Sequence, residues 1–321
     1  MRTELDCIPC LVRQALDAAR FSVREEAAQR RILAEALTML AADAAQHRSP
    51  PQTAQRIHRL VRRASGHDDP YAALKRRSTA VALAALPRLR ALVEQADDPL
   101  DAAVRLAVAA NVLDAGMNRA QMEDDFHDAV DPGEVVADAL EQAARTTLHG
   151  DTAAFRRAVA DADSILFLAD NAGEIVVDRL LIERLPMGRV TVAVRGRPVL
   201  NDATREDAAA AGLDPLARVI DNGSDAPGTL LDDCSPQFRQ AFAAADAIVA
   251  KAQGNSQSAT DDPAAVSSLF NVTFPLVAVH PALLQGTHPL LRSPTTPPRT
   301  GHRAPHRTTP PTTGPADPSG R

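Results

Sequence analysis

Tryptophan is absent from this 321-residue chain, and aromatic residues make up only 3% of it. A hydrophobic core must therefore be built mainly from Ala, Leu and Val, and small side chains of this kind favour closely packed helices. Hydrophobic residues make up 45% of the chain, which is enough material for a globular core.

Cysteine is also scarce. The three cysteines, Cys7, Cys10 and Cys234, cannot form a disulfide framework, which agrees with a reducing compartment. Cys7 and Cys10 have a Cys-x-x-Cys spacing, but no second pair accompanies them. Packing or an accessory thiol role is therefore a simpler interpretation than a redox pair or half of a metal site.

Long apolar runs and an excess of basic charge are missing as well. No uninterrupted apolar stretch approaches the roughly 20 residues that span a bilayer, and the N-terminus lacks the apolar core of a secretory signal. The net charge of −6 argues against nucleic acid or an anionic membrane surface as the main partner. We therefore expect a cytoplasmic protein that has neither partner.

Two regions of different texture precede a third that is poor in apolar residues. Residues 1–160 repeat apolar positions at helical spacing and are expected to form an all-helical domain. In residues 161–284 short β-branched runs alternate with helical segments, which predicts an α/β domain with a doubly wound, mostly parallel, Rossmann-like sheet. Residues 285–321 are rich in Pro, Thr and Arg, and we expect disorder there. Strands are expected at Ser164–Ala169, Val190–Arg195, Arg218–Asp221, Ala247–Lys251 and Pro275–His280.

The first expected strand ends on two oxygen-bearing side chains, Asp170 and Asn171. Gly173 then allows a turn, and Glu174 begins an apolar helix. A hard cation could bind at such a strand end, with a phosphate group beside it. Taken alone, however, the segment is more typical of an ordinary turn between a strand and a helix.

Two further loops carry similar groups. Asn201 and Asp202 follow the second expected strand, and Lys251 ends a later strand before Gln253 and Asn255. Because the carboxyl ends of parallel strands meet at one edge of a sheet, we expect the three loops to lie side by side. Three polar loops at one edge favour a functional site over solvated turns.

The residue types indicate metal-assisted phosphoryl chemistry. Two carboxylates and an amide oxygen, from Asp170, Asp202 and Asn171, suit Mg²⁺ or Mn²⁺, which prefer oxygen ligands. Lys251 could supply fixed positive charge for a phosphoryl group.

The three loops resemble the signature blocks of a known family. Asp170-Asn-Ala-Gly-Glu174, Asn201-Asp-Ala-Thr204 and Lys251-Ala-Gln-Gly-Asn255 look like blocks of the metal-dependent damage-control phosphatases, which were long catalogued as a domain of unknown function. Asp69-Pro-Tyr71 and Ala110-Asn-Val-Leu-Asp114 are similar to segments of the bacterial and archaeal branch of that family. The resemblance implies a helical part packed against an α/β part, with the active site between them. It also implies hydrolysis of small phosphometabolites, such as sugar phosphates or damaged cofactor intermediates, with Mn²⁺, Co²⁺, Ni²⁺ or Mg²⁺.

The resemblance assigns roles by motif position. The metal ligands correspond to Asp170, Asn171 and Asp202, and the residues expected to act in catalysis are Asp170, Glu174 and Lys251. Residues expected to bind the substrate are Asn111, Asp114, Asn201, Thr204, Lys251, Gln253, Gly254 and Asn255.

Two other functions fit the same resemblance. The first is a carboxyl methyltransferase that uses S-adenosylmethionine, because members of the family carry that label, although the usual glycine-rich first loop is missing. The second is a non-catalytic metabolite-binding protein. It is suggested by departures from the pattern of the family at Ala252, where a glycine is usual, and at Ser256-Gln257, where a glutamate is usual.

Overall fold

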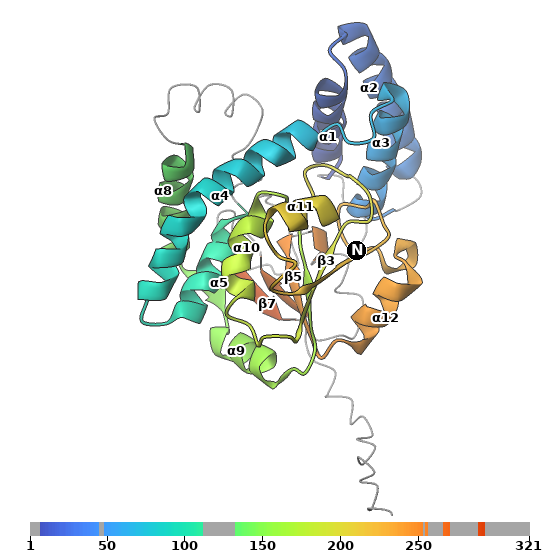
Figure 1. Cartoon of the computed structure of the whole chain (residues 1–321). Helices are drawn as coiled ribbons and strands as arrows, with labels where there is room; N and C mark the ends of the chain where they lie inside the picture. The colour runs from blue at the N-terminus through green and yellow to red at the C-terminus, as the bar shows by residue number, and fades with distance from the viewer. Residues whose placement is uncertain are drawn as a thin grey trace, which may run out of the picture.

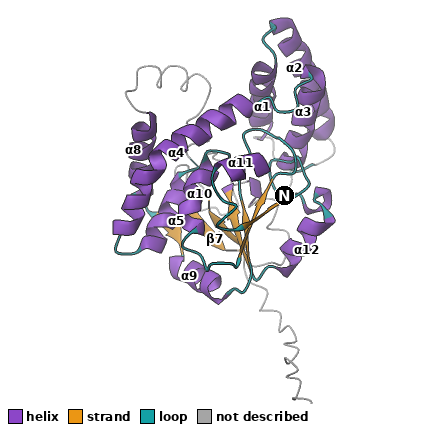
Figure 2. Ribbon diagram, viewed as in Figure 1, coloured by secondary structure: helices purple, strands orange, loops and turns teal. Residues whose placement is uncertain are grey.

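The structure is a computed structural model that describes residues 7–44, 48–111, 132–252, 254–255, 266–269 and 288–292. Figure 1 shows a bundle of the first helices at one end of the molecule, from which a long helix runs across to the rest. The strands gather in the centre with helices around them (Figure 2). The helical region followed by an α/β region therefore agrees with the expectation from sequence.

The helical region begins with a three-helix bundle and continues along α4. None of the described helices is long and apolar enough to cross a membrane. The described helices of this region are α1 (Cys7–Ser22), α2 (Glu26–Ala44), α3 (Pro50–Ser65), α4 (Ala72–Gln95), α5 (Pro99–Ala109) and α8 (Pro132–Ala144).

Local sequence sets the ends of α3. Ser49 and Gln52 form a capping box at its start, and Pro50 occupies the first turn, where no backbone donor is needed. Gly66 ends the helix in the left-handed conformation, with φ of 70°, and its N–H donates to the carbonyl of Arg62. Signals that are readable in the sequence therefore set where α3 begins and ends.

The sheet grows in two directions from β2. Over the described residues its strand order is β1-β7-β6-β5-β2-β3-β4, and both neighbours of β2 pair with it in parallel. The order reverses beside β2, so the carboxyl ends of β2, β3 and β5 lie at one edge, where ligands bind in open α/β sheets. The strands are β1 (Leu148–Gly150), β2 (Ile165–Leu168), β3 (Val190–Val194), β4 (Arg218–Asp221), β5 (Ala247–Lys251), β6 (Val266–Leu269) and β7 (His288–Arg292).

The doubly wound, mostly parallel sheet is confirmed, but two expected boundaries need correction. β1 lies within the region expected to be all helical, and β7 lies within the region expected to be disordered. β7 pairs in parallel with β1 and antiparallel with β6. Backbone hydrogen bonds to two neighbours thus hold a segment whose composition gives no strand signal. The strand expected at Pro275–His280 lies outside the described residues, whereas β6 was not expected.

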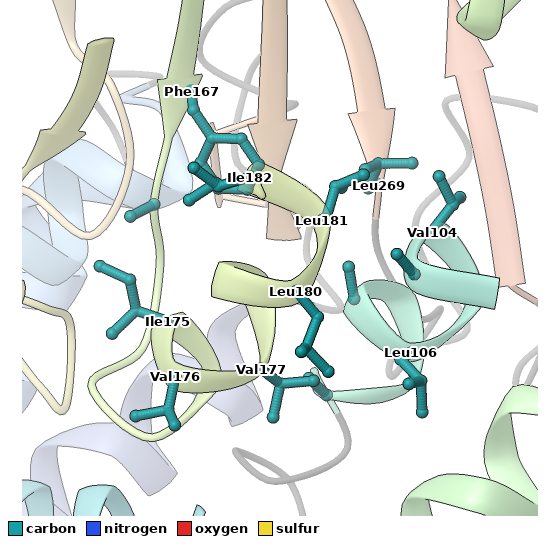
Figure 3. Close-up of a cluster of buried hydrophobic side chains, with 14 of the residues drawn as sticks. Val104, Leu106, Phe167, Ile175, Val176, Val177, Leu180, Leu181, Ile182 and Leu269 are labelled. Atoms are coloured by element: carbon teal, nitrogen blue, oxygen red, sulfur yellow. The ribbon is translucent and has the colours of Figure 1, made fainter. Parts of the chain in front are cut away.

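Helix α10 (Glu174–Ile182) is buried on all sides. It packs against α4 and α5, and every residue in it except Arg179 is buried. Figure 3 shows Ile175, Val177 and Leu181 of α10 among core side chains that include Phe167 of β2 and Leu106 of α5. An acidic side chain on this helix must therefore find its partners inside the protein. The described residues also form α9 (Thr152–Asp161), just before the α/β region, and α11 (Arg205–Ala210) and α12 (Pro236–Ala244) within it.

Candidate functional site

The loops after β2 and β3 meet at the carboxyl edge of the sheet. Asn171 and Asp202 form an isolated antiparallel bridge. The N–H of Ala172 donates to the carbonyl of Asn201 at 2.9 Å, and the N–H of Ala203 donates to that of Asp170 at 2.6 Å. The structure therefore brings together the three residues that the sequence indicates as metal ligands.

Arg195 joins the two carboxylates of this cluster. It follows β3 directly, and its side chain is only 2% exposed. Its Nε lies 2.5 Å from Asp202 Oδ2, and its Nη2 lies 3.3 Å from Asp170 Oδ1. Arg195 is not among the site residues expected from the sequence, although it is a charged residue at the end of an apolar strand, as are Asp170 and Lys251.

The loop after β5 reaches the same cluster through Asn255, which is fully buried. Its amide oxygen accepts from Arg195 Nη1 at 3.0 Å, and its amide nitrogen donates to the carbonyl of Ala169 at 3.1 Å. Gly254 approaches the chain closely, because a Cβ there would lie 2.8 Å from the carbonyl oxygen of Pro227. The third loop therefore joins the site as expected from the topology, although Gln253 lies outside the described residues.

Lys251 points into the protein. Its side chain is fully buried, as are those of Glu174 and Asp178. Its ammonium lies 2.7 Å from Glu174 Oε1 and donates to Asp178 and to the carbonyl of Ala107. Two hydrogen bonds and the ion pair with Glu174 direct the three hydrogens of the ammonium into the protein. The expected contact between Lys251 and a phosphate group is therefore not supported by this geometry, because α10 places two carboxylates over the end of β5.

The buried triad contains two carboxylates and one ammonium. Burial raises the pKa of Asp178 to about 7, and the neighbouring Glu174 carboxylate adds to this effect, while Lys251 opposes it. Burial alone would lower the pKa of Lys251, but Asp178 and Glu174 outweigh it and leave that pKa raised. Lys251 is therefore charged, and the Asp178 carboxyl titrates close to neutrality.

A chain of hydrogen bonds connects this triad to the carboxylate cluster. Glu174 Oε2 accepts from the Asn171 amide nitrogen at 2.9 Å, and the same nitrogen donates to Asp170 Oδ2 at 2.8 Å. Asn111, which follows the C-terminal cap of α5, also donates to Glu174 Oε2 at 3.3 Å. With its nitrogen held by two carboxylates, Asn171 directs its amide oxygen away from them. Glu174 is thus buried and orients Asn171.

Thr204 has a structural partner in this arrangement. It caps α11, its hydroxyl donates to Asp207 Oδ2 at 2.7 Å, and its N–H donates to the same oxygen at 2.8 Å. Lys75 of α4 binds that carboxylate at 3.0 Å and Asp69 at 2.8 Å. The helical region therefore holds the loop that carries Asp202, and the expected contact between Thr204 and substrate remains a prediction.

A second contact between the two regions lies nearby. Asp225, in the loop after β4, is buried and accepts hydrogen bonds from Arg59 and Arg62 of α3. Arg62 also donates to the carbonyl of Pro198 at 2.7 Å. These contacts fix the loop after β3 from the side of the helical bundle.

The donor set fits a hard divalent cation. Asp170, Asn171 and Asp202 offer carboxylate and amide oxygens, and Asp170 gives access to solvent because its side chain is 13% exposed. Within the described residues there is no cluster of three or more His, Cys, Asp and Glu side chains that could form a closed metal site. A cation held here would therefore complete its coordination with water or with oxygens of a ligand. Asp114 lies outside the described residues, and Asn201 contributes its backbone carbonyl to the bridge between the loops.

Comparisons with known proteins agree with the fold and the motifs. Residues 3–286 match the family model of the damage-control phosphatase ARMT1-like domain. A damage-control phosphatase of Archaeoglobus fulgidus is 32% identical over 79% of this chain and 86% of its own length. An uncharacterized protein of Methanocaldococcus jannaschii is also 32% identical, over 80% of this chain and 83% of its own length. The crystal structure of a family protein from Pyrococcus horikoshii has 26% identity and a TM-score of 0.80, and the match covers 92% of this chain and all of that chain.

Proposed function

Because this chain belongs to the damage-control phosphatase ARMT1-like family, we propose that it is a phosphatase that hydrolyses small phosphate esters with the help of a divalent cation. The observation that carries the proposal is the meeting of Asp170, Asn171 and Asp202 at the switch point of the sheet. The relatives named as damage-control phosphatases support the same reaction.

The cation would be held by Asp170, Asn171 and Asp202, and Mn²⁺, Co²⁺, Ni²⁺ and Mg²⁺ all suit these oxygen donors. When bound, it supplies Lewis acidity toward a phosphoryl oxygen and lowers the pKa of a coordinated water. Asp170 is the most exposed of the three proposed ligands, because Asn171 and Asp202 are buried, so we assign to it the orientation of the attacking water. Backbone N–H groups at the start of α10 that the first turn does not use would be further donors for a phosphate group. Those of Ile175 and Val176 already donate to the carbonyls of Asn171 and Gly173.

Lys251 and Glu174 act as positioning residues that lie behind the proposed metal ligands. Lys251 holds Glu174 through a buried ion pair, and Glu174 holds the amide nitrogen of Asn171. This role replaces direct contact between Lys251 and phosphate. It follows the general pattern in which buried hydrogen-bond partners orient the ligands of a metal.

The proposed substrates are small phosphometabolites, either sugar phosphates or damaged cofactor intermediates. We propose that the bond hydrolysed is the ester bond of a phosphate monoester. The site supports a small ligand because the cluster is nearly closed: the side chains of Arg195 and Asp202 are 2% and 4% exposed. A compact phosphate head can reach Asp170, whereas a macromolecular substrate would need a wider opening.

The test is phosphate release from a panel of phosphate esters with each of the four cations and with a chelator. Asp170→Ala should abolish release while the circular dichroism spectrum stays unchanged. Asp221→Ala is a matched control, because Asp221 ends the neighbouring strand β4 and pairs with the exposed Arg205. Release that persists in chelator, or in Asp170→Ala, would contradict the proposal. Binding of S-adenosylmethionine without a metal requirement would favour the methyltransferase alternative.

A further inference from the structure

Arg195 is the one described cation that contacts both carboxylates of the proposed metal site. Its guanidinium is bonded to Asp202 through Nε and to Asp170 through Nη2. Its Nη1 donates to the carbonyl of Gly228 at 3.1 Å and to the amide oxygen of Asn255 at 3.0 Å. All three nitrogens are thus engaged, which fixes the position of the positive charge.

This position has a consequence for the charge of the site. Asp170 and Asp202 carry two negative charges and Arg195 carries one positive charge, so the three side chains sum to one negative charge. A divalent cation would change the sum to one positive charge. Without the guanidinium, the same cation would leave the site neutral. Arg195 therefore determines whether a cation-loaded site is still attractive to an anion.

The burial of these groups makes the effect large. Arg195 and Asp202 are almost fully removed from water, so solvent and salt screen their charges weakly. A guanidinium that shares both carboxylates with a cation lies within a few ångströms of it and repels it. The same guanidinium attracts, through its charge, a phosphate dianion that binds to the cation.

We propose that Arg195 couples the binding of the cation to the binding of phosphate: it weakens the affinity of the site for the cation alone and strengthens the affinity of the loaded site for phosphate. Arg195 is thereby a positioning and affinity-setting residue. The inference rests on the proposed function, because it takes Asp170, Asn171 and Asp202 to be the metal ligands.

The test uses the full-length chain and two titrations. In the first, Mg²⁺ alone is titrated into chelator-treated protein by calorimetry; in the second, inorganic phosphate is titrated at saturating Mg²⁺. Arg195→Met should bind Mg²⁺ at least about tenfold more tightly and bind phosphate at least about tenfold more weakly than the wild type. Arg195→Lys, which keeps the charge, should stay closer to the wild type in both titrations.

Two further variants make the result decisive. Arg195→Gln removes the charge but keeps polar contacts, and it carries the test if Arg195→Met does not fold. Arg205→Met is the matched control, because Arg205 is exposed, pairs with Asp221 and should change neither affinity. If the affinities for Mg²⁺ and for phosphate both fall or both rise in the neutral variants, the inference is overturned. Loss of structure alone would weaken the binding of both ligands. Absence of Mg²⁺ binding by the wild type would instead overturn the proposed function.

Discussion

The ammonium of Lys251 donates a hydrogen bond to the carboxylate of Asp178, and both side chains are fully buried. Glu174 Oε1 lies 2.7 Å from the same ammonium. A buried charge is costly unless it is paired, so the three groups depend on one another. Because Glu174 also accepts a hydrogen bond from Asn171, the triad contributes both to the stability of the core and to the geometry of the site.

Removing Lys251 should be strongly destabilising. Lys251→Met leaves Glu174 and Asp178 buried without their cation, which predicts a loss of about 3 to 5 kcal/mol in the free energy of unfolding. The measurement is urea denaturation followed by circular dichroism. Arg156→Met, which breaks the exposed pair with Asp98, should cost less than about 1 kcal/mol. A loss of similar size in both variants would contradict the triad.

The raised pKa of Asp178 predicts that the stability of the protein depends on pH. Its pKa is raised by burial to about 7, so between roughly pH 4 and pH 7 the folded chain holds a proton that the unfolded chain has released. The contribution of this group to stability therefore falls as pH rises through that window and then levels off. Asp178→Asn cannot titrate, so its stability relative to the wild type should rise between pH 5 and pH 8, by up to about 1.4 kcal/mol per pH unit.

Asp98→Asn is the control for this trend. The pKa of Asp98 is lowered by its hydrogen bond from Arg156, so its contribution is lost only at more acidic pH. Its stability difference from the wild type should stay flat between pH 5 and pH 8. A flat difference for Asp178→Asn as well would show that Asp178 ionises at its ordinary pKa in the folded chain.

Ala252 predicts a stabilising substitution. Its φ of 59° lies in the left-handed region, which costs a residue with a side chain about 1 kcal/mol and costs glycine little. Ala252→Gly should therefore raise the free energy of unfolding by about 0.5 to 1 kcal/mol. Ala243→Gly, at an exposed position within α12, should lower it by a similar amount. A loss in both variants would contradict the strain at Ala252.

Thr204 should behave as a helix cap. Thr204→Ala removes the hydrogen bond to Asp207 and should cost about 1 kcal/mol of stability, whereas Thr204→Ser should retain most of it. Thermal unfolding checks both variants. If the hydroxyl acts only as a cap, Thr204→Ser should also leave the KM for a phosphate ester unchanged. A KM that rises several-fold in Thr204→Ser with unchanged stability would favour contact with the substrate.

The sequence is sufficient to place the main loops of the site. Asp170 and Asp202 each follow an apolar run at the end of a strand, and parallel topology requires such ends to share an edge. The same rule places the backbone of Lys251 at this edge, because Lys251 ends β5. The direction of its side chain, however, depends on the carboxylates of α10. That helix carries Asp178 in an almost continuous apolar sequence, which is a signal that a buried acid needs a partner.

The remaining differences come from contacts between segments that are far apart in the chain. β7 is a strand because β1 and β6 pair with its backbone, and composition does not report such pairing. Leu200 adopts a left-handed φ of 48°, while its side chain packs against the hydrophobic cluster of the helical bundle. The strain directly before Asn201 is thus held by packing against another region, which local propensity cannot show.

The most direct test of the central claim is a Mn²⁺ titration monitored by electron paramagnetic resonance of the free ion. The wild type should bind one ion per chain, and phosphate-ester hydrolysis should rise with the same Mn²⁺ dependence. Asp202→Asn should lower the affinity at least about tenfold, and Asp221→Asn should leave it unchanged. Equal Mn²⁺ binding by wild type and Asp202→Asn would contradict the assignment of the site.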